Sequence, residues 1–352
     1  MKWEENVRKV VPYVPGEQPK RQDIIKLNTN EFPYSPAPAV KKALEDFDYD
    51  NLRLYPDPAI TNLVGAVADT YGLKPENVFV GVGSDDVLAM AFLTFFNSDK
   101  KILFPDITYS FYDVWADLYR IPYEVQPLNE DFSICKEDYF KENGGVIFPN
   151  PNAPTGVEES LEMIEEIIKK NPDVVVIIDE AYVDFGAKSA LPLIEKYENL
   201  LVVQTFSKSR ALAGIRIGCA FGSEKIIKYL NDAKFSFNSY TISRLTEAIG
   251  CASLGDKEYF ASTVQKVIDT RERTKTRLTE LGFSFADSKA NFIFATHKSV
   301  SAKELFEAMR EEGIIVRYFN KPRIDNHLRI SIGTDEQMDA MLAFLTEYLK
   351  DK

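Results

Sequence analysis

Short apolar runs alternate with helical patterns between about residue 75 and residue 205. Residues 174–178 and 200–203 have no polar side chain, as expected of strands that are buried on both faces. Similar runs at 78–80 and 146–148 are also followed by helix-like segments. Repeated strand-helix alternation favours a mainly parallel sheet with helices on both sides. The sequence therefore predicts an α/β fold.

The pattern changes after residue 240. A long helical pattern covers residues 256–281 and stops at Gly282, a residue type that commonly ends helices. Short strand and helix patterns then alternate to the end of the chain. We expect a large domain at 36–265 and a smaller α+β domain made of 266–352 together with an N-terminal arm, 1–35.

The arm begins with regularly spaced apolar residues. Trp3, Val7, Val10 and Val11 fit one face of a short amphipathic helix, which we expect to end at residues 13–16. The first residues have no apolar stretch of the kind found in a signal peptide.

Charge and residue counts exclude several classes of protein. The net charge of −12 argues against nucleic acid as a partner, because binding a phosphate backbone needs a basic surface. Three scattered cysteines form no C-x-x-C pair, and two histidines make a histidine-based metal centre improbable. We therefore expect no metal, no nucleic acid and no membrane partner, and a reducing, cytoplasmic setting.

Lys208 is the strongest candidate for chemistry. It follows the strand-like run 200–203, and Ser207 and Arg216 share its glycine-containing loop. A lysine beyond a strand end suits Schiff-base chemistry, since burial or nearby cations can make its amine nucleophilic. Alone, a loop lysine is more often a solvated surface charge.

Asp179 and two tyrosines extend this site. Asp179 ends the run 174–178, and ligands of parallel sheets bind beyond the carboxyl ends of strands. A carboxylate there can pair with a pyridine nitrogen; the alternatives are a helix N-cap or a metal ligand. Tyr182 is placed to donate to a ring oxygen and Tyr109 to stack on a ring face, although each fits an ordinary packed tyrosine as well.

A glycine turn at residues 81–85 joins a strand to a helix. Gly83, Ser84 and Asp85 would let the backbone and a helix N-terminus approach a phosphate, although Ser84 also fits a simple N-cap. Ser207 and Arg216 can add a hydroxyl and a bidentate guanidinium to the same group. These parts together are those that a pyridoxal-phosphate site needs.

With these residues assembled, the sequence resembles the fold-type I pyridoxal-phosphate aminotransferases. Within them it resembles the class II histidinol-phosphate aminotransferase family. The resemblance covers nearly the whole chain and is carried by the segments at 13–16, 27–31, 54–57, 83–85, 151–156, 179–182, 207–208, 214–218 and 328–331. It implies a mainly parallel sheet in the large domain and a smaller α+β domain.

The resemblance also implies roles for individual residues. Lys208 would bind the pyridoxal-phosphate aldehyde and move the proton of the substrate α-carbon, with Asp179 and Tyr182 as the other catalytic residues. The implied cofactor contacts are Gly83, Ser84, Asp85, Tyr109, Asn152, Asp179, Tyr182, Ser207, Lys208 and Arg216. Tyr55 would reach the phosphate in the neighbouring subunit of a homodimer. The implied substrate contacts are Arg329, Arg317, Tyr13 and Asn30.

Two segments depart from the family pattern. Relatives commonly have asparagine immediately before Pro-Thr-Gly, where this chain has Ala153 and places Asn152 one position earlier. The Asn-Glu-Asn-Pro stretch of many relatives reads Asn30-Glu31-Phe32-Pro33 here. We expect Asn152 to substitute for the missing side chain and Phe32 to reshape the pocket entrance.

The function implied is transfer of the amino group of histidinol phosphate to 2-oxoglutarate. The products would be imidazole acetol phosphate and glutamate, which places the reaction in histidine biosynthesis. Three alternatives stay open: an aromatic amino acid aminotransferase, a phosphothreonine decarboxylase of the same fold, and a pyridoxal-phosphate-binding module without catalysis.

Overall fold

The computed structural model describes residues 2–13, 17 and 23–352. Its α-helices are α1 (Pro38–Glu45), α2 (Thr61–Tyr71), α3 (Ser84–Phe95), α4 (Tyr112–Tyr119), α5 (Leu161–Lys170), α6 (Glu224–Phe237), α7 (Arg244–Gly255), α8 (Lys257–Glu280), α9 (Ala302–Glu311) and α10 (Asp335–Tyr348). Its strands are β1 (Ile25–Lys26), β2 (Val78–Gly81), β3 (Ile102–Pro105), β4 (Tyr123–Gln126), β5 (Gly145–Pro149), β6 (Val176–Asp179), β7 (Leu200–Thr205), β8 (Gly218–Gly222), β9 (Phe283–Phe285), β10 (Phe292–His297), β11 (Ile314–Ile315), β12 (Arg317–Tyr318) and β13 (Leu328–Ser331).

A seven-stranded sheet forms the centre of the larger part of the molecule. Its strand order is β2-β8-β7-β6-β5-β3-β4. β8 runs antiparallel to β2 and β7, whereas β5, β6 and β7 are parallel to one another. The mainly parallel sheet predicted from the apolar runs is therefore confirmed.

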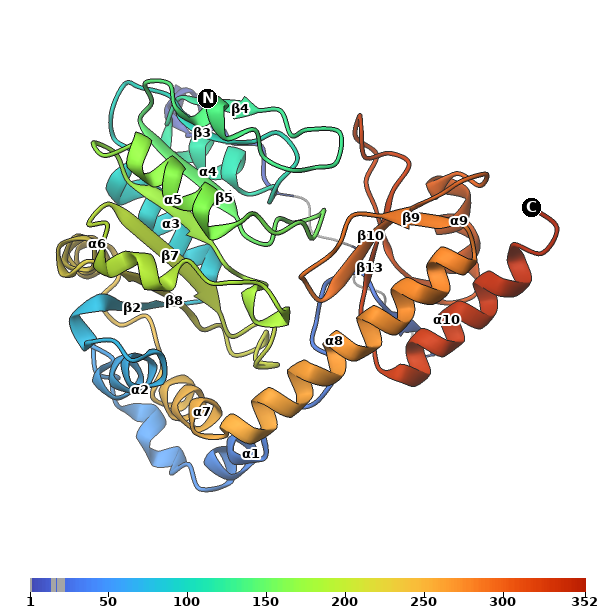
Figure 1. The fold of residues 1–352 in the computed structure, drawn as a ribbon. Helices are drawn as coiled ribbons and strands as arrows, with labels where there is room; N and C mark the ends of the chain where they lie inside the picture. Colours follow the sequence, from blue (N-terminus) through green and yellow to red (C-terminus); the bar gives the residue numbers. More distant parts are fainter. Residues whose placement is uncertain (1, 14–16, 18–22) are drawn as a thin grey trace.

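Helices bury both faces of this sheet (Figure 1). Along β6, Val176 and Ile178 pack into a core that includes side chains of α2, α5 and α7. Ile177 faces the opposite way, into a core shared with α3, α4 and α6. Because successive strand side chains point to opposite faces, a wholly apolar strand satisfies both cores.

A smaller part follows α8. The antiparallel sheet β12-β13-β10-β9 packs with α8 and α10 in a separate core. The N-terminal segment joins it through the parallel pair β1–β11, in which Ile25 lies opposite Ile314. α8 runs without a break from the large part to the small one (Figure 1), so the expected boundary at 265/266 falls inside this helix. The division into domains stays a prediction.

The N-terminal arm differs from expectation. A 3₁₀ helix, η1 (Lys2–Asn6), stands where a longer amphipathic helix was predicted, and that prediction is wrong. Trp3 is 60% exposed and Val11 83% exposed, because the described chain offers these side chains no core of its own. Residues 14–16, at which the helix was expected to end, lie outside the described residues.

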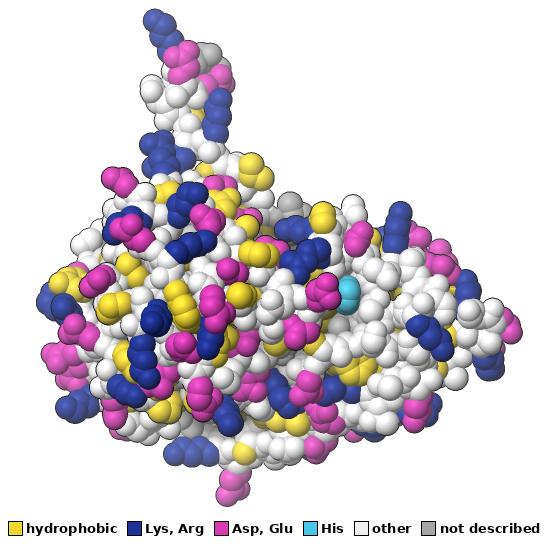
Figure 2. Space-filling view, turned by 45° about the horizontal axis from the view of Figure 1, so that its top comes forward, with side chains coloured by type: hydrophobic (Ala, Val, Ile, Leu, Met, Phe, Trp, Pro, Cys, Tyr) yellow, Lys and Arg dark blue, Asp and Glu magenta, His cyan; other side chains and the backbone are white. Residues whose placement is uncertain are grey.

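Acidic and basic side chains are interspersed on the face shown in Figure 2. In the described part of the chain, no helix has both the length and the apolar character needed to cross a bilayer.

Candidate active site

A cavity of about 200 Å³ lies at the carboxyl ends of β5, β6 and β7. Residues from distant parts of the sequence meet here, as expected of a site at the strand ends of a parallel sheet. The predicted site residues that line it are Ser84, Asp85, Tyr109, Asp179, Tyr182, Ser207, Lys208 and Arg216.

Lys208 extends from the loop after β7. Its Nζ donates to the carbonyl oxygen of Thr29 at 3.4 Å and lies 5.6 Å from the centre of the Tyr182 ring. The hydroxyl of Thr29 is buried without a partner among the described residues, although Thr29 lines the same cavity. Sequence reasoning gave Thr29 no role, and its place beside Asn30 was the only available signal.

Asp179 is the last residue of β6 and is almost completely buried. Its Oδ2 accepts a hydrogen bond from the Tyr112 hydroxyl at 2.9 Å, and its Oδ1 accepts one from the Ala181 amide at 3.2 Å. Burial raises the pKa of Asp179 to about 6, while these two donors and the Lys208 ammonium act in the opposite direction. The carboxyl group is thus poised for a cationic or protonated partner.

The hydroxyl of Tyr182 is already oriented. It accepts a hydrogen bond from Asn30 Nδ2 at 3.0 Å, so its own hydrogen is left to donate elsewhere. Asn30 is held in turn by Ser331, whose hydroxyl donates to Asn30 Oδ1 at 2.8 Å. Asn30 adopts a left-handed backbone conformation with φ of 55°, which asparagine tolerates better than most residues.

The N-terminus of α3 and the Lys208 loop form a cradle at one end of the cavity. The first N–H groups of a helix have no intrahelical partner, and here they belong to Ser84 and the residues after it. Arg216 Nη1 donates to the Ser207 hydroxyl at 3.1 Å, and Arg216 Nη2 lies 3.5 Å from Asp85 Oδ2. Two hydroxyls, a guanidinium and a helix N-terminus are suited to a phosphate.

Tyr109 closes one side of the same cavity. Its hydroxyl donates to Asp85 Oδ1 at 2.8 Å, which fixes the ring from the cradle end. The Asp85 carboxylate therefore contacts both side chains: Oδ1 accepts from Tyr109, and Oδ2 lies beside Arg216.

A second cavity of about 570 Å³ adjoins the first and shares Tyr109 and Ala153 with it. Arg317 and Arg329 line this second cavity from directly opposite positions on β12 and β13. Their guanidinium groups lie 5.5 Å and 5.6 Å from the ring of Phe319.

Among the described residues, neither of these arginines forms an ion pair with a carboxylate, and Arg329 Nε is buried without a hydrogen-bond partner. Arg329 Nη2 donates to the Asn28 carbonyl at 3.0 Å, and burial lowers the pKa of Arg329. Two neighbouring guanidinium groups in an acidic protein indicate an anion site.

Two further predicted residues have contrasting positions. Tyr13 lines the second cavity, and its ring stacks on Phe111 with 4.2 Å between centres. Tyr55 lines neither cavity; its side chain is 77% exposed and packs against Tyr240, with 4.8 Å between ring centres.

Asn152 lies behind the cavities. Its Nδ2 donates to the Ile107 carbonyl and to the Thr155 hydroxyl, both at 3.0 Å, and its Oδ1 accepts from Thr108 at 3.2 Å. Ala153 lines both cavities and Asn152 lines neither. The Asn152 side chain therefore braces the loop, and its contact with a cofactor stays a prediction.

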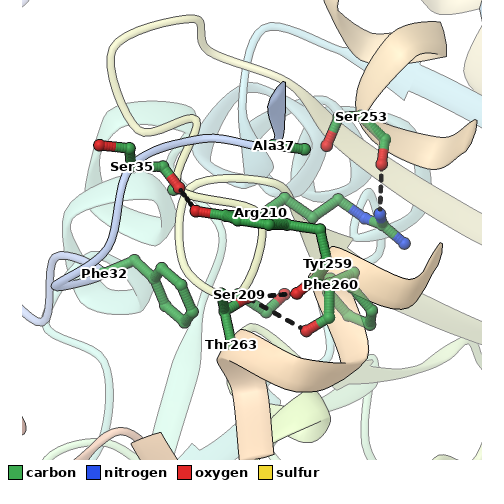
Figure 3. Close-up of a pocket in the computed structure, with 10 residues that line it drawn as sticks. Phe32, Ser35, Ala37, Ser209, Arg210, Ser253, Tyr259, Phe260 and Thr263 are labelled. Atoms are coloured by element: carbon green, nitrogen blue, oxygen red, sulfur yellow. Dashed lines mark hydrogen bonds between the residues drawn. The ribbon is translucent and has the colours of Figure 1, made fainter. Parts of the chain in front are cut away.

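The residues after Lys208 are anchored on the far side of their loop. Ser209 donates a hydrogen bond to Asp184. Arg210 Nη1 donates to the Ser253 carbonyl at 3.2 Å, and its guanidinium lies 4.2 Å from the centre of the Phe260 ring (Figure 3). Arg210 thus anchors the loop of Lys208 on α7 and α8.

The residues present fit pyridoxal phosphate. The cradle suits its phosphate, Asp179 its ring nitrogen, and Lys208 its aldehyde. Two observations support the fit independently. The Thr29 hydroxyl is buried at the cavity without a partner in the described part of the chain, and a Cβ added to Gly83 would lie 2.4 Å from Arg216 Nη2. In the described residues, no cluster of three or more His, Cys, Asp or Glu side chains is placed to hold a metal ion.

Comparisons with known proteins agree with this geometry. Residues 22–345 match the family of class I and II aminotransferases. Histidinol-phosphate aminotransferase from Lactococcus lactis subsp. cremoris (strain SK11) is 54% identical over 100% of this chain and 99% of its own length. The enzyme of the same name from Brachyspira hyodysenteriae is 50% identical over 99% of this chain and 98% of its own length.

A solved structure gives the same fold. Histidinol-phosphate aminotransferase from Sinorhizobium meliloti, in complex with pyridoxal-5′-phosphate, superposes with a TM-score of 0.82 at 23% identity. The match covers 92% of this chain and 90% of that one. At this identity the likeness supports the fold.

Proposed function

The chain belongs to the histidinol-phosphate aminotransferase family, within the class I and II aminotransferases, and from that premise we propose that it transfers the amino group of histidinol phosphate to 2-oxoglutarate. The products are then imidazole acetol phosphate and glutamate. One observation carries the proposal beyond family membership: the cavity of Lys208 and Asp179 adjoins a second cavity lined by two arginines that form no ion pair with a carboxylate of the described residues.

The first cavity provides the parts of a transamination site. Bound pyridoxal phosphate supplies an aldehyde that takes up an amino group and a ring that withdraws electrons. Lys208 would hold that aldehyde and move the proton of the substrate α-carbon. Asp179 would hold a proton on the ring nitrogen, and Tyr182 would donate to the ring oxygen.

Other residues hold the cofactor in place. Ser84, Ser207 and Arg216 bind its phosphate, and Tyr109 covers the ring face and excludes water. Asp85 supports this arrangement by holding Tyr109 and Arg216.

The second cavity supports the proposal that one site accepts two different substrates. Histidinol phosphate carries a phosphate, and glutamate carries a side-chain carboxylate. A guanidinium fork pairs with either group, because each presents paired oxygens. Arg329 and Arg317 therefore bind the distal anion, with Tyr13 on the cavity wall and Asn30 held beside the cofactor by Ser331.

In this proposal the protein forms a homodimer, and Tyr55 acts in the neighbouring subunit. Its side chain is exposed and lies outside both cavities of its own chain. Tyr49, Leu52 and Phe237 are likewise exposed apolar side chains. Tyr55 then reaches the cofactor phosphate bound by the second subunit. A cytoplasmic setting stays a prediction.

The substrate is tested with purified protein loaded with pyridoxal phosphate. Histidinol phosphate, phenylalanine, tyrosine and phosphothreonine are added separately, and the absorbance change from the aldehyde to the amine form of the cofactor is followed. We expect histidinol phosphate to convert the cofactor fastest, because it alone combines an imidazole, an amine and a phosphate suited to the arginine pair.

The other outcomes identify the alternatives. Faster conversion by phenylalanine or tyrosine points to an aromatic amino acid aminotransferase. Carbon dioxide release from phosphothreonine points to a decarboxylase. Bound cofactor that no amine changes points to a binding module without catalysis.

A further inference from the structure

The proposed reaction gives no role to Tyr112. It is the first residue of α4, and its side chain is fully buried. Its ring packs edge-on against Tyr109, at 5.8 Å between centres, and against Phe104, at 5.9 Å. A phenylalanine would fill this apolar position equally well, so the hydroxyl needs a separate explanation.

That explanation is its contact with Asp179. The Tyr112 hydroxyl lies 2.9 Å from Asp179 Oδ2, within the range of a good O–H···O bond. A buried hydroxyl costs free energy unless it is bonded, and the bond to Asp179 removes that cost.

The direction of this bond is fixed. Burial, and then the nearby Asp179 carboxylate, raise the pKa of Tyr112 well above its usual value. Tyr112 therefore keeps its hydrogen, and the ionised form of Asp179, which has no hydrogen of its own, can only accept it. A donor to the ionised form of a carboxyl group favours that form, whereas burial favours the neutral form.

We propose that Tyr112 is a positioning residue that keeps Asp179 ionised and correctly turned toward the cofactor's ring nitrogen. The Ala181 amide holds the other oxygen, so each carboxylate oxygen has one protein donor and spare lone pairs for the ring. This inference rests on the proposed function, because it assigns Tyr112 to the partner of the cofactor ring.

Other charged or titratable groups also face Asp179. Asp85, from α3, opposes its ionisation, and Lys208 favours it. Tyr109 and Tyr182 lie close enough to affect Tyr112 itself. Of the side chains in this group, Tyr112 is the one that donates a hydrogen bond to Asp179 in the described structure.

The test is Tyr112→Phe in protein loaded with ¹⁵N-labelled pyridoxal phosphate. We expect the ring-nitrogen resonance to move toward its unprotonated position, because Asp179 has lost a donor to its ionised form. We also expect kcat to fall about tenfold or more, with little change in KM, since hydrogen bonds to charged groups are the stronger class.

Tyr139→Phe is the matched control. Tyr139 is also fully buried in the core, but its hydroxyl has no hydrogen-bond partner among the described residues. This substitution should leave the resonance and kcat unchanged, which separates the loss of a bond from the loss of a buried hydroxyl.

Asp179→Asn locates the effect. It should move the resonance on its own, and adding Tyr112→Phe should then change little, because the two residues act as one unit. An unchanged resonance in Tyr112→Phe alone overturns this inference and leaves the proposed function standing. An unchanged resonance in Asp179→Asn overturns both, and it does so without any substrate being used.

Discussion

At the scale of single residues, Glu180 shows how close a structural carboxyl group lies to a catalytic one. It follows Asp179 directly but does not line the cavity. It accepts hydrogen bonds from Ser189, from the Ala190 amide and from Gln204, at 2.6 to 2.9 Å. Burial nevertheless raises its pKa to about 7. The folded protein therefore binds a proton at Glu180 more tightly than the unfolded chain does.

This shift predicts a pH dependence of stability. The stabilising effect of protonating Glu180 is fully present below its ordinary pKa of 4.5 and is lost as the pH rises through about 7. Relative to Glu180→Gln, the wild type should lose up to about 3 kcal/mol of unfolding free energy over that range. Urea unfolding at pH 4.5 and pH 8, without added cofactor, measures the difference.

Asp179 contributes equally to both proteins and cancels in that comparison. Glu162→Gln, on the exposed side of α5, is the control and should follow the wild type at both pH values. Parallel pH curves for wild type and Glu180→Gln would contradict the expected shift.

The sequence predicted the candidate catalytic residues better than the residues that hold them in place. Lys208 and Asp179 could be found because each is a polar residue directly beyond an apolar strand. Tyr112 could not, since its ring fits a helix core and its bond to Asp179 spans 67 positions. Asn152 had suitable chemistry, but only the folded loop shows that its amide bonds Ile107, Thr108 and Thr155.

At the scale of elements, the phosphate cradle depends on two strands lying very close to a helix. β8 pairs with β2 so that Gly218 lies opposite Gly81. A Cβ on Gly218 would lie 2.3 Å from both the carbonyl carbon of Gly83 and the amide nitrogen of Ser84. The N-terminus of α3 therefore takes its position partly from the missing side chain at 218.

Gly218→Ala should displace that helix start and weaken pyridoxal-phosphate binding. Overpacking of this kind typically costs about 1–3 kcal/mol, which corresponds to about tenfold or more in affinity. The dissociation constant is measured by titrating cofactor against protein fluorescence. Gly214→Ala is the control, because a Cβ there meets nothing within 4 Å in the same loop. Equal affinities for the two variants would exclude this role for Gly218.

The strands and helices that could be predicted from the sequence are those whose burial leaves a clear apolar pattern. β6 and β7 were found because their runs are wholly apolar, and α8 because its pattern is long and ends at Gly282, with φ of 88°. The sequence analysis did not predict β8, because its short segment begins and ends with a glycine and so resembles a turn. Its strand character comes from pairing with β2 and β7, and such long-range pairing leaves no local pattern.

At the scale of the whole molecule, the site joins the large and small parts. Arg323, in the loop between β12 and β13, pairs with Asp106 at 2.7 Å and donates to the Leu128 carbonyl at 2.6 Å. Asn30 connects Tyr182 to Ser331 of the small sheet. The second cavity is lined by both parts, so their relative position sets its shape. None of these contacts could be predicted from the sequence, because each joins segments more than 100 positions apart.

The homodimer can be tested by mixing two inactive or weakened variants. If Tyr55 serves the neighbouring subunit, a hybrid of Lys208→Ala and Tyr55→Phe has one intact site: Lys208 from one chain and Tyr55 from the other. Random reassortment of equal amounts should restore about one quarter of wild-type activity, since about half the dimers are hybrids with one good site each. Lys208→Ala mixed with Asp179→Asn is the control, because both residues lie in one chain's cavity and no intact site can form. If Tyr55 instead served its own chain, the first mixture would recover no more activity than this control, beyond what Tyr55→Phe retains alone.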